Sequence, residues 1–212
     1  VTGFLAPIMA LIYVTAASLI LLMHLGDIGT SFGLIIEMAF NPPATIAGTG
    51  GGILLTMLWG IKRGLYSNEA GQGSAAIAHS TAKTKYPVRE GAVAMLGPYI
   101  DTIVICTLTG LVIISTGAWH HTEFYKNAID PYFTGELLNS SLLTAFAFKT
   151  GLNSFFDYGD KIVTASVLLF AVSTAISWSF YGDRSTEYLF GEKAIIPYRL
   201  VFVLFVFLGA IA

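Results

Sequence analysis

The chain has 212 residues, of which 55% are hydrophobic and only 11% are charged. Soluble domains carry about 25% charged residues, so this composition excludes a water-soluble enzyme and a disordered tail. A net charge of −2 excludes a nucleic-acid-binding domain, and a single cysteine excludes a disulfide framework or a multi-cysteine zinc site. The composition therefore indicates an integral membrane protein.

The two ends of the sequence indicate an internal piece of a longer protein. Val1 is not a Met and does not begin a signal sequence. Ala212 ends an apolar run that starts at Val201, which is shorter than the roughly 20 residues that a membrane-spanning helix needs. We therefore expect further functional residues outside this segment.

The first apolar stretch predicts a membrane-spanning helix over 4–25, in which Pro7 lies in the first turn and costs no hydrogen bond. The next segment, 26–39, mixes acids and glycines with apolar residues. This mixture predicts a short amphipathic helix at the membrane surface, which the Asn-Pro-Pro sequence at 41–43 ends.

Four further spans complete a predicted all-α, polytopic helix bundle, in a single transmembrane domain over 1–212. They are expected at 52–81, 90–116, 161–181 and 200–212, the last of them truncated. Glycines and polar residues interrupt the span at 52–81, which is therefore expected to be discontinuous, with a helix resuming over 75–82. The segment 119–160 predicts a long polar loop.

Lysine and arginine in the short links predict the orientation of the spans. Three such residues lie within 83–89 and three more within 183–199, so both links are expected in the cytoplasm. The loop 119–160 and the segment 26–45 then lie outside. This alternation is consistent with a multi-pass protein of the cell (inner) membrane.

The most unusual sequence lies between Arg63 and Ser74. An interrupted spanning helix is tolerated only where it lines a cavity or a ligand. Backbone carbonyls freed before such a break would coordinate sodium, and N–H groups freed after it would bind a carboxylate. Flexible or ligand-like groups are supplied by Asn68, Glu69, Gly71, Gln72 and Gly73.

Two interpretations of this segment remain open. In the first, the helix breaks either at 48–52 or at 67–73, and the break binds a zwitterionic amino acid together with a cation. In the second, Lys62 and Arg63 mark the end of a complete helix, and 67–73 is a cytoplasmic loop.

A second cluster of hydroxyl groups lies at 173–179. Thr174 and Trp178 are four residues apart and share a helix face, so a hydroxyl above an indole would hold a polar head group and close over a small side chain. Ser173 and Ser179 lie beside them. Alternatively, the hydroxyls bond to their own helix and Trp178 belongs to the aromatic belt at the membrane interface.

Asp101 is an intramembrane acid within the span 90–116. Such acids act in ion paths, or are buried and hydrogen-bonded to a neighbouring helix. A pairing of Asp101 with Glu69 would suggest an intramembrane enzyme, but no established catalytic motif accompanies them, so no catalytic residue is predicted. The pair His120-His121 lacks further ligands, and no metal other than sodium is expected.

Three strings together resemble the alanine/glycine:cation (sodium:alanine) symporter family. They are GIKRGLYSNEAGQGSAAIAH at 60–79, YIDTIVICT at 99–107, and STAISWSFYG at 173–182 followed by YLFG at 188–191. The resemblance runs over nearly the whole chain and about half of a family member. It implies an inverted-repeat fold of the LeuT type, of which this chain supplies about helices 5–9, with the discontinuous helix near 52–81.

The resemblance also implies a function. Members of the family carry small neutral amino acids, alanine and glycine, together with sodium and in some cases protons, and they use no other cofactor. The chain is accordingly expected to be part of a bacterial or archaeal symporter that works by alternating access. The alternative is a non-transporting sensor or structural subunit on the same scaffold.

The family pattern assigns roles to the clusters described above. Ser173 and Thr174 fall where the fold places cation ligands. Substrate contacts are implied for Asn68, Glu69, Gly71, Gln72, Gly73, Thr174, Trp178 and Ser179. The part of the site that the first helix supplies would lie upstream of Val1.

Overall fold

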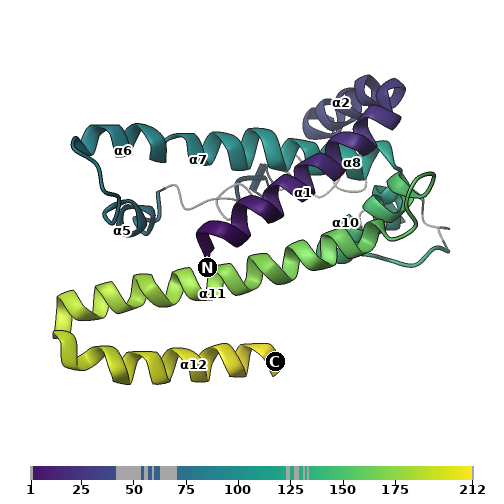
Figure 1. Cartoon of the computed structure of the whole chain (residues 1–212). Coiled ribbons are helices and arrows are strands. Elements are labelled where there is room, and N and C mark those ends of the chain that lie inside the picture. Colours follow the sequence, from purple (N-terminus) through teal and green to yellow (C-terminus); the bar gives the residue numbers. More distant parts are fainter. Residues whose placement is uncertain are drawn as a thin grey trace.

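The computed structural model of the chain describes residues 2–41, 54, 57–58, 60–62, 71–122, 125–126, 129–130, 132 and 134–211. All regular structure in these residues is helical (Figure 1), which confirms the predicted all-α class. Among the described residues, four helices are long and apolar enough to cross a membrane: Gly3–Met23, Pro87–Ser115, Gly159–Phe190 and Glu192–Ile211.

The first two helices lie where the sequence predicts them. Helix α1 (Thr2–Met23) contains Pro7 near its start, and α2 (Leu25–Phe40) follows after a bend at His24. The imidazole Nδ1 of His24 donates a hydrogen bond of 3.0 Å to the Ile20 carbonyl and so closes the end of α1.

A long helical run forms the span predicted at 90–116. It consists of α6 (Pro87–Ala94), α7 (Leu96–Pro98), the π-helical segment η1 (Tyr99–Cys106) and α8 (Thr107–Ser115). Pro98 has no N–H group and disturbs the preceding turn, so the regular α-helical bonds are interrupted where the wider π-helical turns begin. The residue pattern at 90–116 predicts a span but not this change of helix type.

The segment 119–160 differs from the long polar loop predicted for it. It begins within the short helix η2 (Ala118–His121) and contains α10 (Ser140–Leu152), whose Phe148 is completely buried. Helix α10 escaped prediction because it is too short to span a membrane and because Lys149 interrupts its apolar pattern.

The charged link predicted at 183–199 is also largely helical. Helix α11 (Gly159–Phe190) continues well beyond the predicted end at residue 181. Gly191, with φ +81°, and the short helix η3 (Glu192–Ala194) then reverse the chain into α12 (Ile195–Ile211). At about 1.5 Å per residue, α11 is about 48 Å long and exceeds a hydrocarbon core of about 30 Å.

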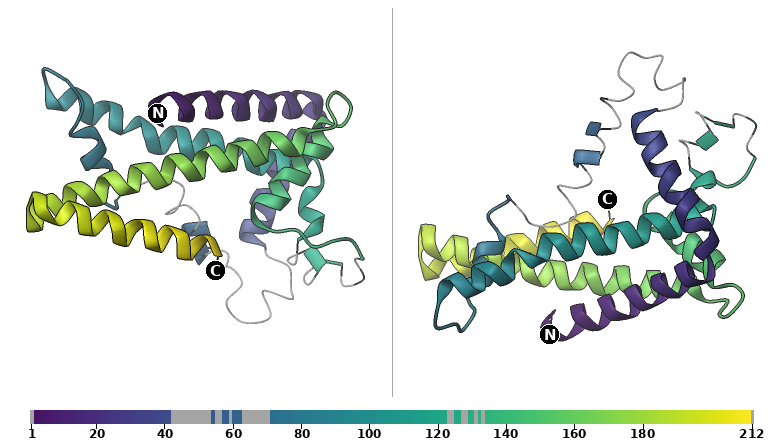
Figure 2. Two further views of the ribbon diagram at one scale, coloured as in Figure 1. Left: turned by 60° about the horizontal axis from the view of Figure 1, so that its bottom comes forward. Right: turned by 90° about the horizontal axis from the view of Figure 1, so that it is seen from above.

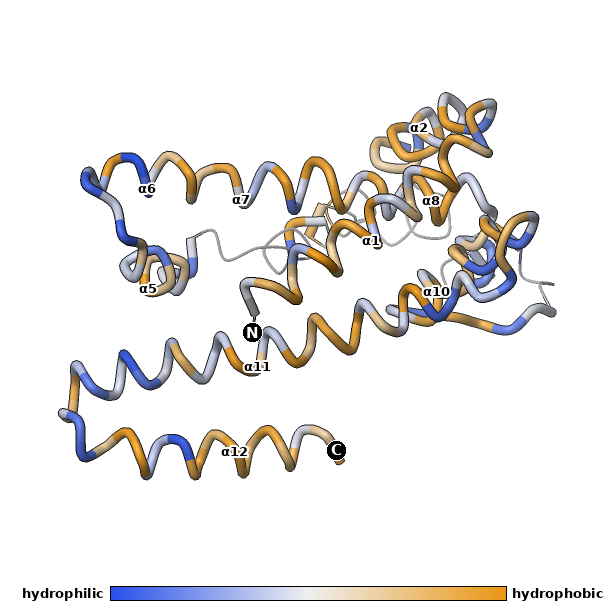
Figure 3. Tube along the Cα trace, viewed as in Figure 1, coloured by the Kyte–Doolittle hydropathy of each residue, from blue (hydrophilic) through white to orange (hydrophobic). Residues whose placement is uncertain are grey.

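The buried core lies at one end of the molecule, where α1, α8, α10 and α11 meet (Figure 2). Its fully buried large side chains are Ile20, Val112 and Phe148. Gly151 allows a close approach, because a Cβ atom there would lie 2.6 Å from the Cγ2 of Ile20. Outside this core, the helices expose apolar side chains along most of their length (Figure 3), as lipid-facing helices do.

The two basic links lie at the opposite end of the molecule. The α5–α6 link and the α11–α12 turn are at one end of the long helices, and α10 is at the other (Figure 1). This arrangement agrees with the orientation predicted from the lysine and arginine residues, which places both links on one side of the membrane.

Candidate functional site

Ser173, in the middle of α11, is the most informative residue of the predicted site. Its side chain is buried, and α11 packs against α1 and α12. Among the buried side-chain nitrogen and oxygen atoms that the structure describes, the Oγ of Ser173 is the one without a hydrogen-bond partner.

Three other hydroxyl groups, in or at the end of the spanning helices, bond to the backbone of their own helix. The Oγ1 atoms of Thr109, Thr116 and Thr164 donate to the carbonyls four residues earlier, over 2.8, 2.7 and 3.0 Å. Ser173 does not, so the alternative that the hydroxyls of 173–179 simply satisfy their own helix is wrong at this position. A buried hydroxyl without a partner costs about 1–3 kcal/mol, and a bound ligand would offset that cost.

The other predicted residues of α11 are more accessible. Thr174 and Ser179 are half-buried, and the indole of Trp178 is 44% exposed. Trp178 packs edge-on against the Tyr181 ring, with the ring centroids 5.8 Å apart. The hydroxyl of Thr174 and the indole therefore lie one turn apart, beside the buried hydroxyl of Ser173.

The predicted glycine-rich segment is described only in part. Asn68 and Glu69 lie outside the described residues, as does the alternative break at 48–52. Gly71 and Gly73 have φ values of +81° and +83°, a conformation that favours glycine, and both are exposed, as is Gln72.

A short helix resumes after this turn, as predicted. Helix α5 (Ala75–His79) starts directly after Ser74 but ends before the predicted residue 82, where Ser80 and Thr81 bond back to the carbonyls of Ile77 and Ala78. Helix α5 packs against α11. The structure thus brings the end of the glycine-rich segment to the helix that carries Ser173, Thr174, Trp178 and Ser179.

Asp101 lies apart from this cluster in the packing of the described helices. It is half-buried within the π-helical segment η1, which packs against α7 and α8, its neighbours along the same run. A polar contact joins the start of α8, which follows this segment, to α1. The hydroxyl of Thr109 donates to the Ile105 carbonyl, so the Tyr13 hydroxyl, 2.8 Å away, is the donor to the Thr109 oxygen.

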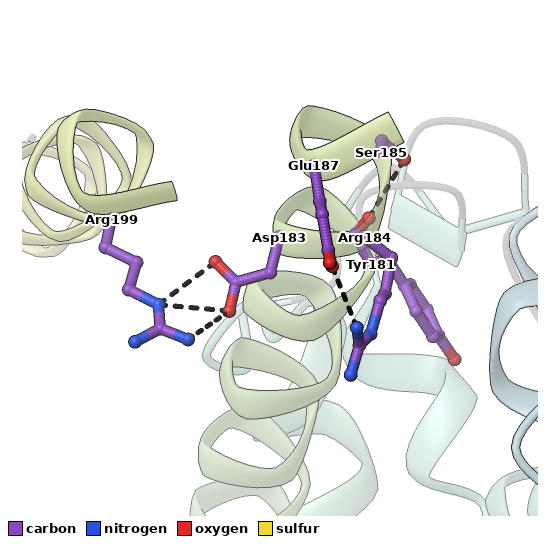
Figure 4. A network of polar contacts seen from close by, with 6 residues as sticks. All are labelled: Tyr181, Asp183, Arg184, Ser185, Glu187 and Arg199. Carbon is purple, nitrogen blue, oxygen red and sulfur yellow. Dashed lines mark hydrogen bonds and ion pairs between the residues drawn. The ribbon is translucent and has the colours of Figure 1, made fainter. Parts of the chain in front are cut away.

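One ion pair joins α11 and α12 beyond Trp178, and a second lies within α11 (Figure 4). The guanidinium of Arg199 on α12 makes three hydrogen bonds of 2.7–3.1 Å to the carboxylate of Asp183 on α11. Arg184 pairs with Glu187 at 2.8 Å within α11. Next to these pairs Gly182 leaves room for the ring of Tyr198, which a Cβ atom would overlap.

The contacts between α11 and α12 cannot be predicted from local sequence because their partners, Asp183 with Arg199 and Gly182 with Tyr198, are sixteen residues apart in the chain. Local sequence likewise does not predict the contact of the His79 Nδ1, which lies 2.6 Å from the Oε1 of Glu90 and joins α5 to α6. In the described part of the chain, no group of three or more histidine, cysteine, aspartate or glutamate side chains is arranged to hold a metal ion.

Comparison with known proteins identifies the family. The model of the sodium:alanine symporter family matches residues 1–212. The chain belongs to the sodium:alanine symporter family. Because this is a family of symporters, the intramembrane-enzyme hypothesis for Asp101 and Glu69 is not retained.

Several relatives match along the whole chain. It is 42% identical over 211 residues to the sodium/alanine symporter AgcS of Methanococcus maripaludis, covering 100% of this chain and 43% of that protein. It is 38% identical to an uncharacterized transporter of Haemophilus influenzae, covering 99% and 42%. It is 37% identical to the uncharacterized transporter YflA of Bacillus subtilis, again covering 99% and 42%.

The chain therefore spans about two fifths of the length of these symporter-family relatives. The resemblance stated from the sequence is confirmed at the level of the family.

Proposed function

We propose that the protein carrying this chain is a secondary active transporter that couples a cation, sodium, to the uptake of a small neutral amino acid by alternating access. Membership in the sodium:alanine symporter family and the name of the archaeal relative support sodium and alanine as substrates. Glycine is the second candidate substrate. The activity belongs to the multi-pass protein in a bacterial or archaeal cell membrane, and it requires no cofactor besides the coupling ion, sodium with or without protons.

The single structural observation that carries this proposal is the unpartnered, buried hydroxyl of Ser173. Sodium is a hard cation that binds oxygen ligands, and in inverted-repeat transporters such ligands gather near the bilayer midplane. Ser173 lies about midway along α11. We assign Ser173 and Thr174 as cation ligands, together with oxygen atoms that other helices supply.

The amino acid is assigned to the accessible face beside this cation. Thr174 and Ser179 offer hydroxyl groups to its polar end, and Trp178 limits the size of its side chain. The second wall is the segment with Asn68, Glu69, Gly71, Gln72 and Gly73, whose last residues lead into α5 against α11. Asp101 is assigned to an ion path apart from this pocket.

Coupling follows if sodium and the amino acid together favour the closed state more than either ligand alone. In the proposed LeuT-type arrangement, one group of helices then rocks against the other around the fixed site. Helices α11 and α12 suit the stationary group, because Gly182, Tyr198 and the Asp183–Arg199 pair join them closely.

Uptake of labelled alanine by the full-length protein in liposomes tests the proposal. An inward sodium gradient is expected to drive accumulation, and an equal potassium gradient is expected not to. Uptake that responds to neither sodium nor proton gradients would contradict symport. Binding of alanine without counterflow would identify the alternative, a non-transporting sensor.

A further inference from the structure

The link between α5 and α6 carries an exposed basic patch, which we define as Lys83, Lys85, Tyr86 and Arg89. Two of its cations lie against one aromatic ring. The Nζ of Lys85 is 5.7 Å, and the Cζ of Arg89 is 5.1 Å, from the centroid of Tyr86. Such cation–π contacts restrict side chains that would otherwise be highly flexible.

Three of the acids near this end of the molecule are engaged elsewhere, and Glu192 lies in the α11–α12 turn. Glu90, the residue next to Arg89, is hydrogen-bonded to His79. Asp183 and Glu187 at the end of α11 pair with Arg199 and Arg184. Within the described part of the chain, Lys83, Lys85 and Arg89 make no ion pair, so the patch keeps its positive charge.

The patch lies immediately outside a membrane span. The apolar helix that crosses the membrane begins at Pro87, directly after Tyr86. Figure 3 shows this change from hydrophilic to hydrophobic along the start of α6. Tyr86 is 50% exposed and Val88 is 83% exposed, so an exposed aromatic and an exposed apolar side chain lie between Lys85 and Arg89 at the start of the span. Cations beside apolar side chains match the chemistry of a phospholipid, in which a phosphate is joined to acyl chains.

We propose that the basic patch binds the headgroup of an anionic phospholipid. The phosphate accepts hydrogen bonds from Lys85 and from the planar guanidinium of Arg89, with Lys83 adding charge, while Tyr86 and Val88 contact the glycerol and the first acyl carbons. A free phosphate shares the cationic contacts but gains nothing from Val88 and Tyr86. Fixing of the two cations by one ring reduces the entropy lost on binding.

Binding of dioleoyl phosphatidylglycerol to the full-length protein, counted by native mass spectrometry from detergent, tests this site. The zwitterionic dioleoyl phosphatidylcholine serves as the reference lipid. Each surface cation contributes about fivefold to such binding, so K85Q/R89Q is expected to weaken phosphatidylglycerol binding at least tenfold. The control K126Q/K149Q removes two cations from the other end and is expected to change binding less than about twofold.

Two further comparisons examine the lipid and the ring. Inorganic phosphate at millimolar concentration is expected not to displace phosphatidylglycerol, and full displacement would show that the patch is a site for free anions. Tyr86→Phe keeps the ring face and is expected to bind phosphatidylglycerol like the wild type. Tyr86→Leu removes the ring and is expected to bind it severalfold more weakly. Equal losses in K85Q/R89Q and K126Q/K149Q would overturn the proposal.

Discussion

The two halves of α11 are held in different ways. The first half, from Gly159 toward Ser173, packs into the apolar core with α1 and α10, and its Val163 is buried. The second half, from Thr174 to Phe190, runs beside α12 (Figure 2), to which Gly182 and the Asp183–Arg199 pair join it. Ser173 lies where the two halves meet.

The first half of α11 therefore has a structural role, and the second half carries most of the candidate binding residues. The first half is anchored to the core through the buried Gly159 and Val163, and this anchor supports the position of Ser173, although most of its other side chains are exposed. The second half presents Thr174, Trp178 and Ser179 on surfaces that are only partly covered. A rigid support next to an accessible binding surface is what a precise site requires.

The largest effect on stability is expected at the start of the first half. In Gly159→Ala the new Cβ atom would overlap the backbone carbonyl of Phe148, which cannot move without shifting α10. We expect a loss of about 3 kcal/mol in the free energy of unfolding, measured as a lower midpoint of thermal unfolding. Gly110→Ala is the control, because nothing lies within 4 Å of its Cβ position. Equal midpoints of thermal unfolding for the two variants would contradict the close packing of Gly159 against α10.

A smaller loss of stability, which a second substitution is expected to restore, is predicted in the second half. In Gly182→Ala the Cβ atom meets the end of the Tyr198 side chain rather than backbone. The ring can move, so we expect a loss of about 1–2 kcal/mol. Adding Tyr198→Leu is expected to restore most of the lost stability in the same thermal measurement. A double variant no more stable than Gly182→Ala alone would show that the contact does not join the two helices.

Trp178→Ala distinguishes a substrate-facing indole from an interfacial one. The indole is 44% exposed, so its removal is expected to change stability little. If it limits the size of the substrate side chain, valine should compete with labelled alanine about tenfold better in the variant than in the wild type. If affinity and selectivity stay unchanged, the indole belongs to the membrane-interface belt.

The smallest expected effect concerns pH and lies outside the spans, at His120. Its ring packs 4.5 Å from the rings of Trp119 and Tyr125. Burial, and secondarily the charge of His121, lowers the pKa of His120 below its ordinary value of 6.5. The unfolded chain therefore binds a proton first as the pH falls.

The contribution of His120 to stability is accordingly complete above about pH 6.5 and is lost as the pH falls toward the lowered pKa of the folded state. His120→Phe keeps an aromatic ring and is expected to flatten this dependence. The midpoint of thermal unfolding between pH 8 and pH 5, in the wild type and in His120→Phe, measures this pH dependence. An unchanged slope in His120→Phe would assign the pH dependence to other groups.

Hydropathy and residue spacing predict the long helices well, because a membrane span needs only a long apolar run. They also predict the restart of a helix after Ser74. They do not predict α10, which is short. They also do not predict the π-helical turns after Pro98, because these depend on which backbone hydrogen bonds form around a residue without an N–H group.

The candidate site is predictable in its residue types but not in its contacts. The hydroxyl groups of Ser173 and Thr174 are visible in the sequence, whereas the missing partner of Ser173 depends on the packing of α11 in the folded chain. Likewise, Asp183 and Arg199 are sixteen positions apart, and they come into contact only because the chain reverses at Gly191. Tertiary packing, rather than local pattern, decides these features.

The proposed symport depends on the buried Ser173 hydroxyl as a cation ligand. Thermal unfolding of the full-length protein in sodium against potassium tests it, since a ligand at 100 times its Kd stabilises the folded state by about 2.7 kcal/mol. Ser173→Ala is expected to lose the sodium-dependent rise while keeping or raising its midpoint in potassium, because an unpartnered buried hydroxyl is removed. Thr116→Val, which removes a hydroxyl already bonded to Val112, is expected to keep the sodium response. A full sodium response in Ser173→Ala would contradict the account.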